Sequence, residues 1–140
     1  MKKFKYTLGL ILIISHLVVI FSLILLKLLG GYDMSEFSTL IAIIIPTFAG
    51  YTTSIIMFIV KDKYKTKNKT DKPVTTAFKF LSLLFPISLT ICICISIWLQ
   101  GFNLAFDNFE DFKHFILIVQ SLFSIYSGYL IYTIFDKSKT

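Results

Sequence analysis

The chain has 140 residues, of which 56% are apolar and only 16% are charged, and its mean hydropathy is +0.79. A soluble domain of this length cannot hide so much apolar surface. The net charge of +6 comes from 14 lysines, with no arginine, against 8 acids. In a membrane protein such an excess of positive charge is explained first by topology and not by a nucleic-acid partner. The composition excludes a separate soluble catalytic domain and predicts an all-α integral membrane protein with a single domain, residues 1–140.

Four apolar segments predict a bundle of four transmembrane helices. The first begins after a basic start that resembles a secretory signal, but it is too long for one and no cleavage site follows it. At 1.5 Å per residue it makes roughly 33 Å of helix, enough to cross the hydrocarbon core. Lys27, near its far end, can extend its amine to the interface. The predicted spans cover about residues 8–29, 38–60, 78–99 and 115–134.

The connections between these spans differ in character. Gly30 and Gly31 end the first span, and a short acidic turn follows. Phenylalanines at helical spacing, interleaved with acids, predict a short interfacial helix over about residues 102–112, with Asp107 and Glu110 capping its start. The alternative is an aromatic belt at the membrane surface, joined by Trp98. The loop at residues 61–73 is too polar to enter the membrane.

The lysines are distributed unequally between the two sides of the membrane. Twelve fall on the side of the termini and the 61–73 loop, and only two on the other side. Cytoplasmic segments carry this excess, so both termini should be cytoplasmic and the protein a multi-pass protein of the bacterial inner membrane. Each loop lysine attracts an anionic leaflet by about 1 kcal/mol, and a cytoplasmic protein partner is the alternative contact. These lysines are Lys61, Lys63, Lys65, Lys67, Lys69 and Lys72.

No reaction is indicated by the residues inside the spans. The spans contain no Asp or Glu, whereas proton-coupled transporters normally need an intramembrane carboxylate. A phosphate-binding loop, an HExxH motif and a nucleophile with a base at one depth are all missing from the sequence. Cys92 and Cys94 stand two apart on a helix and cannot pair with each other. We therefore expect neither an enzyme nor a bound cofactor or metal.

The few polar residues within the spans are the candidates for a polar path. His16 is the single ionisable group at mid-membrane, and it either makes hydrogen bonds across the bundle or lines a pore. The hydroxyls around Pro46 either satisfy carbonyls that the proline frees or face a passage. The candidate path residues are His16, Thr47, Thr52, Thr53, Ser54 and Gln120.

Two further sets concern helix shape and packing. Pro46, Gly50 and Pro86 are candidate hinges, because proline removes a backbone hydrogen bond and can bend a helix. A second set places small residues on one face of the fourth span, which suits close helix contact within one chain or between copies. That set is Ser121, Ser124 and Gly128, and it makes a homo-oligomer the expected assembly.

The stretch from Pro46 to Thr53, Pro-Thr-Phe-Ala-Gly-Tyr-Thr-Thr, runs into the lysine-rich loop and resembles RexB-like four-span membrane proteins of phage-exclusion systems. The resemblance implies an effector that assembles and permeabilises or depolarises the membrane when a cytoplasmic partner senses infection. A second resemblance, at Ser127-Gly128-Tyr129, is to GtrA-like four-span proteins that move polyprenyl-linked sugars. Those proteins carry asparagines early in their spans, whereas the first asparagine here is Asn68.

The leading hypothesis from the sequence is an oligomeric effector that permits ion or solute permeation, or disrupts the membrane, under the control of a partner. A GtrA-like transporter of lipid-linked sugars is the alternative, and a structural subunit of a larger membrane complex is the third.

The predicted topology can be tested with reporter fusions. A cytoplasmic reporter fused after Thr140 and a periplasm-dependent reporter inserted between Gly31 and Ser35 should both be active, because the lysine distribution places these sites on opposite sides. A periplasmic signal from a fusion within residues 61–72 would reverse the orientation.

Overall fold

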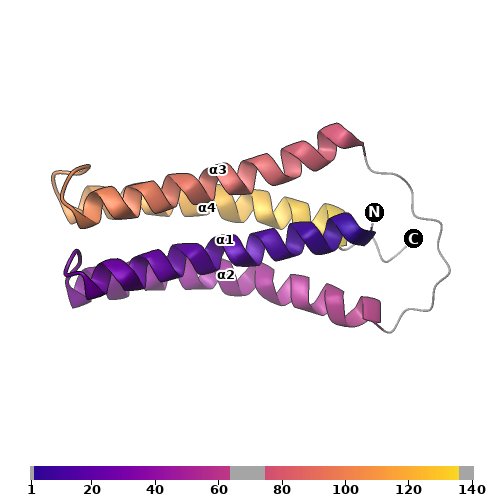
Figure 1. Ribbon diagram of the computed structural model, residues 1–140, viewed down its shortest axis with the longest axis horizontal. Helices are drawn as coiled ribbons and strands as arrows, with labels where there is room; N and C mark the ends of the chain where they lie inside the picture. Colours follow the sequence, from indigo (N-terminus) through magenta and orange to yellow (C-terminus); the bar gives the residue numbers. More distant parts are fainter. Residues whose placement is uncertain (1, 64–74, 136–140) are drawn as a thin grey trace.

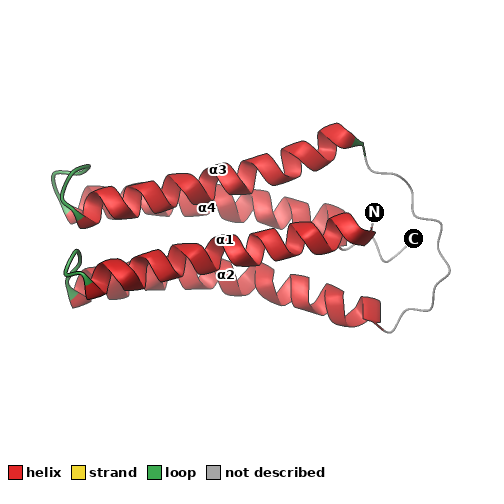
Figure 2. Cartoon of the chain, in the orientation of Figure 1, coloured by secondary structure: helices red, strands yellow, loops and turns green. Residues whose placement is uncertain are grey.

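The computed structural model describes residues 2–63 and 75–135, and in this part of the chain it contains four long α-helices and no strand (Figures 1 and 2). The helices are α1 (Lys2–Leu28), α2 (Met34–Lys63), α3 (Thr76–Gly101) and α4 (Phe109–Phe135). Each contains a stretch long and apolar enough to cross a membrane. These stretches are Phe4–Leu28, Met34–Met57, Thr76–Gly101 and Phe109–Tyr132, which confirms the four predicted segments.

Consecutive helices run antiparallel, so that the bundle has two distinct ends (Figure 1). The loops at residues 29–33 and 102–108 lie together at one end, which we call the loop end. The start of α1, the end of α2, the start of α3 and the end of α4 lie at the other, which we call the far end. Each helix packs against two neighbours, in the order α1, α2, α4, α3 around the bundle. In Figure 1, α2 and α3 diverge toward the far end.

The first and third helices end in the same way. Gly30 has a φ of 82°, and the next N–H, that of Gly31, donates to the carbonyl of Leu26 at 2.9 Å. In α3, Asn103 takes the same left-handed conformation with a φ of 57°, and the following N–H donates to the carbonyl of Leu99 at 2.9 Å. This pattern satisfies carbonyls at the helix end and reverses the chain. Glycine adopts that conformation without strain, and asparagine is the residue that most often replaces it.

The second helix begins with a reciprocal cap at Asp33 and Glu36. The Glu36 N–H donates to Asp33 Oδ1 at 2.8 Å, and the Asp33 N–H donates to Glu36 Oε2 at 2.9 Å. This arrangement satisfies two N–H groups at the start of the helix that lack helical partners. The same Glu36 N–H lowers the pKa of the Asp33 carboxyl, which therefore remains charged beside the positive end of the helix dipole.

The predicted interfacial helix over residues 102–112 is wrong, because residues 102–108 form a loop and the later residues belong to α4. The left-handed Asn103 ends α3, and Asn108 starts α4 by accepting the Asp111 N–H at 2.9 Å. Asn108 is therefore the capping residue, in place of the predicted Asp107. The spacing of the phenylalanines reflects packing instead: Phe106 lies 5.3 Å from the ring of Phe112, measured between ring centroids.

The interior consists of two apolar clusters stacked along the bundle. The cluster nearer the loop end is contributed by all four helices, whereas the cluster nearer the far end has no fully buried hydrophobic residue from α3. There α3 buries Ser82, one turn before the buried Pro86. The lower content of large apolar side chains agrees with the divergence of the helices at this end. On the outside of the bundle, every helix exposes large apolar side chains. Such a surface would promote aggregation in water, but it is the normal surface of a helix in contact with lipid.

The two helical hairpins, α1–α2 and α3–α4, meet in a close backbone contact at the loop end. A Cβ added to Gly31 would lie 2.8 Å from the carbonyl oxygen of Gly101, so only glycine lets the two backbones approach this closely. Beside this contact the buried Tyr32 hydroxyl donates to the Ile97 carbonyl at 2.6 Å, and Lys27 Nζ donates to the Tyr32 carbonyl at 3.1 Å. Burial raises the pKa of the Tyr32 hydroxyl above its usual range, so the group remains a donor.

Part of the predicted basic loop lies outside the described residues, including Lys65, Lys67, Lys69 and Lys72. The helix α2 continues past its predicted end at residue 60, so that Lys61 and Lys63 belong to its last turn. Lysine is favoured there because the C-terminal end of a helix carries partial negative charge.

Replacing Gly31 with alanine should lower the free energy of unfolding by about 1–3 kcal/mol, because the added methyl group forces the hairpins apart. Unfolding by SDS titration of the protein in detergent micelles measures this change. Gly50→Ala is the matched control, since a Cβ there meets no atom within 4 Å. Equal stability of the two variants would show that the contact at the loop end is not close.

Candidate functional site

A polar layer separates the two apolar clusters at the middle of the bundle. On α1, His16 stands between Leu12 and Val19, which belong to different clusters, and on α4 Gln120 stands between Val119 and Phe123 in the same way. Both polar side chains are buried, with His16 only 1% exposed. The two residues therefore interrupt the apolar core at about half its length.

The imidazole of His16 is surrounded by aromatic rings. It stacks on Phe48 with a centroid distance of 5.8 Å, and it meets the edges or faces of Tyr51 at 4.9 Å and Phe123 at 4.5 Å. The carbonyl of Leu12, one turn earlier, interacts with it electrostatically, but neither ring nitrogen has a well-formed hydrogen bond to any described residue. His16 is thus part of the aromatic core and not the wall of an open passage.

The side chain of Gln120 is buried in a similar way, without hydrogen bonds to described residues. Neither its amide nitrogen nor its amide oxygen has a hydrogen-bond partner among the described residues. A buried polar group without a partner costs about 1–3 kcal/mol, and a mid-membrane site offers no bulk water to supply one. The hydrogen bonds across the bundle that were one expectation for His16 have no counterpart among the described residues.

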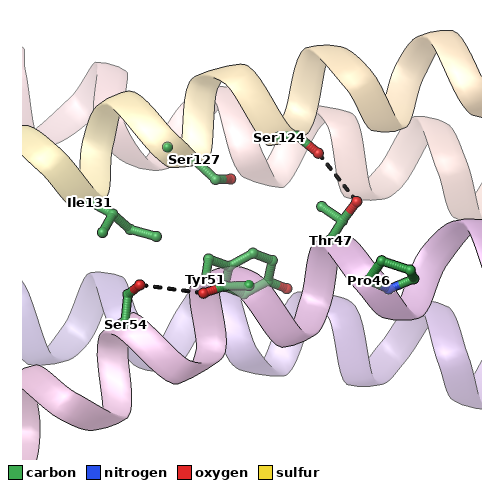
Figure 3. A pocket seen from close by; sticks show the side chains of 9 residues that line it. Pro46, Thr47, Tyr51, Ser54, Ser124, Ser127 and Ile131 are labelled. Atoms are coloured by element: carbon green, nitrogen blue, oxygen red, sulfur yellow. Dashed lines mark hydrogen bonds between the residues drawn. The ribbon is translucent and has the colours of Figure 1, made fainter.

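A groove opens between α2 and α4 on the outer face of the bundle, with a volume of about 430 Å³ (Figure 3). It lies in the half nearer the far end. Most of its lining residues are glycine, serine or threonine, although the surface that the lining exposes is more apolar than polar. The lining residues are Pro46, Thr47, Gly50, Tyr51, Ser54, Ser124, Ser127, Gly128 and Ile131.

The hydroxyls of the groove differ in how they are bonded (Figure 3). Thr47 Oγ1 and Ser124 Oγ lie 3.2 Å apart and join α2 to α4 at the end of the groove that is nearer the loop end. Ser54 Oγ donates to the Gly50 carbonyl at 3.3 Å within its own helix. Ser127 is only 1% exposed, and its Oγ, which points into the groove, has no partner among the described residues.

The groove exists because both walls lack side-chain volume. A Cβ added at Gly50 or at Gly128 would meet no atom within 4 Å. Of the small face predicted on α4, Ser124 contacts α2 through Thr47, whereas a Cβ at Gly128 would meet no atom within 4 Å and Ser121 is exposed. Tyr51 closes the groove on the inside: its ring lines the groove and also contacts the imidazole of His16.

The predicted polar path is divided between different surroundings. Thr47 and Ser54 line the groove, while His16 and Gln120 lie in the core. The Thr52 hydroxyl is buried without a partner among the described residues.

The other hydroxyls near the prolines bond within their own helices. Thr53 Oγ1 donates to the Ala49 carbonyl at 2.8 Å, and Thr90 Oγ1 donates to the Pro86 carbonyl at 2.8 Å. Neither accepting carbonyl is one that a proline frees, since those belong to Ala42 and Ser82. All three candidate hinges, Pro46, Gly50 and Pro86, lie inside continuous helices.

Sequence reasoning missed three members of the groove, namely Tyr51, Ser127 and Ile131. A usable signal was present: Ser124, Ser127 and Gly128 follow the three- and four-residue steps of one helix face, as do Thr47, Gly50 and Ser54 on α2. That the two faces are neighbours depends on the pairing of α2 with α4, which spacing does not reveal.

The chemistry available in the groove is hydrogen bonding by hydroxyls. Among the described residues no three histidine, cysteine, aspartate or glutamate side chains come close enough to hold a metal ion. Comparison of the chain with protein-family models, with curated proteins and with solved structures gives no match.

Because both imidazole nitrogens are buried and neither has a good partner among the described residues, His16→Leu should keep the fold and raise the free energy of unfolding by about 1–3 kcal/mol. SDS titration in micelles again provides the measurement. Val19→Ala, one turn along the same face, should instead lose stability by leaving a cavity. A loss in His16→Leu similar to that of the control would mean that the imidazole is hydrogen-bonded, for example to internal water.

Proposed function

We propose that this protein is an oligomeric membrane effector that permits ions or small solutes to cross the bilayer, or disrupts it, under the control of a cytoplasmic partner. The observation that supports the proposal most directly is the position of the hydroxyl-lined groove. It faces outward between α2 and α4, whereas the centre of the bundle is filled by two apolar clusters.

A path for ions needs polar groups along it, because an ion in hydrocarbon loses its hydration without compensation. Within one chain the apolar side chains around Val19 and Leu12 occupy the places where such a path would run. The groove supplies hydroxyls on a surface that another molecule can complete. Permeation through this protein therefore requires an assembly in which grooves face each other or face a partner.

The control by a partner and the role in phage defence rest on the resemblance of residues 46–53 to RexB-like proteins. In that scheme the basic segment that follows α2 receives the signal. It is joined directly to α2, which forms one wall of the groove. A displacement of the end of α2 would therefore change the width of the groove.

The open side of the groove also favours a second candidate, the GtrA-like transport of polyprenyl-linked sugars. A laterally open groove admits a lipid chain from the membrane, and hydroxyls can bind a sugar or phosphate oxygen near its end.

The proposal is tested by inducible expression with a membrane-potential dye, in the presence of the partner or of phage infection. Wild-type protein should depolarise the cells, and Ser54→Ala combined with Ser127→Ala should suppress this effect by removing two hydroxyls from the groove. Thr53→Val is the matched control, since its hydroxyl bonds within α2 and does not line the groove.

All variants are compared at matched amounts of inserted protein. Depolarisation that survives the double alanine change would exclude this groove as the path. Wild-type protein that never depolarises cells under any condition would remove the effector function and leave transport of a lipid-linked sugar as the favoured candidate.

A further inference from the structure

The start of α3, residues 75–85, is weakly anchored in the bundle, and we call this segment the α3 arm. In the apolar cluster nearer the far end, α1, α2 and α4 each bury two large side chains, whereas α3 buries none. Within the arm the one buried side chain is Ser82, which is too small to fill the space between helices. Phe78 and Leu83 are only partly buried against the cluster.

The arm ends at a proline. Pro86 has no N–H to donate to the Ser82 carbonyl, so the helix bends more easily here than where its hydrogen bonds are complete. A proline also interrupts α2, but beyond Pro46 the side chains of Tyr51 and Ile55 are buried and hold that helix in the cluster. In Figure 1, α3 diverges from α2 toward the far end. Of the two helices that contain a proline, α3 is therefore the less restrained.

Apolar contacts hold the arm only weakly in a membrane. Lipid chains are as apolar as the side chains of the cluster, so the hydrophobic effect does not oppose movement of the arm into lipid. Van der Waals packing remains, and one such contact is the edge of the Phe78 ring against Phe4 of α1, with 6.5 Å between centroids. Hydrogen bonds between the arm and its neighbours therefore have a large influence on its position.

A tyrosine of α4 makes such a hydrogen bond. The Tyr126 hydroxyl donates to the Leu81 carbonyl at 2.9 Å, and it also interacts with the side chain of Ser82. The Tyr126 ring packs on Phe85, with 4.3 Å between centroids. Leu81 lies five residues before Pro86, so this bond joins α4 to the part of α3 that a bend at the proline would move.

We propose that the α3 arm is a hinged element that swings away from α1 and α4 about Pro86, and that the Tyr126 hydroxyl holds it closed. The structure shows the closed state. In the open state the far-end cluster loses the cover of Phe78 and Leu83, and a lateral opening forms between α1 and α4. The inference goes beyond the proposed function, because it concerns the motion of a single chain and not what crosses the membrane.

Distances between spin labels in lipid nanodiscs test the hinge. The native cysteines are first removed by Cys92→Ala and Cys94→Ala. A label at Ala77→Cys on the arm is then paired with one at Met57→Cys on α2, where both positions are exposed. A second pair replaces the arm label with one at the exposed Ile95→Cys, on the other side of the bend. Double electron-electron resonance should give a main and a longer minor distance for the arm pair, and one distance for the second pair.

Removing the hydroxyl should favour the open state. Tyr126→Phe keeps the ring, and it should raise the ratio of the longer to the shorter arm distance roughly three- to tenfold, the effect of one hydrogen bond. Tyr129→Phe, on the next residues of α4 with a side chain exposed to 62%, is the matched control and should leave the ratio unchanged. Pro86→Ala restores the missing N–H, so it should leave only the shorter distance.

An arm distribution that neither Tyr126→Phe nor Pro86→Ala alters would overturn the inference. Equal broadening of the Ile95 pair would do so as well, because it would mean that the whole bundle loosens. A third pair, Met57→Cys with Tyr132→Cys on α4, shows by its constant distance that each variant is folded. Arm motion in a protein that never depolarises cells would retain the hinge and refute the effector function, whereas depolarisation with an immobile arm would retain the function and refute the hinge.

Discussion

The close approach of Gly31 to the backbone of Gly101 fixes the relation of the two helical hairpins. The turn of each hairpin is closed by local hydrogen bonds, and the second helix of each is capped locally. Joining the hairpins requires a surface where two backbones can meet, and only these glycines provide it in the described turns. The Tyr32 hydroxyl then connects the first turn to α3 at Ile97. From this fixed end the helices extend, and their separation elsewhere depends on the side chains between them.

The volume of those side chains decreases along the bundle. Near the loop end all four helices bury large apolar groups, and the packing is closed. Toward the far end α3 buries Ser82, and the facing walls of α2 and α4 are rich in glycine and serine. The half near the loop end is therefore closely packed, and the half near the far end contains the groove. The open positions at Gly50 and Gly128 lie in this second half, as does the Ser127 hydroxyl, which has no partner among the described residues.

The elements were predictable because bilayer thickness requires long apolar runs, and because lysine, proline and glycine mark where these runs end. The turn at Gly30 could be anticipated for the same reason. The loop at residues 102–108 could not, since the phenylalanines there follow helical spacing and only the conformation of Asn103 breaks the helix. The candidate site was predicted in part. Spacing identified Thr47, Ser124 and Gly128, but it could not show that their helices are neighbours, nor that His16 turns inward to aromatic rings while Ser54 turns outward.

The aromatic surroundings of His16 have a spectroscopic consequence. An imidazole stacked on Phe48 and flanked by Tyr51 and Phe123 lies within the ring-current fields of three aromatic rings. Its ring protons should resonate far from those of His114, the second histidine of the chain, which is exposed near the loop end. Because the rings belong to α2 and α4, any relative movement of these two helices changes the shielding. The imidazole signal of a single native residue can therefore report on the width of the bundle at its centre, without an added label.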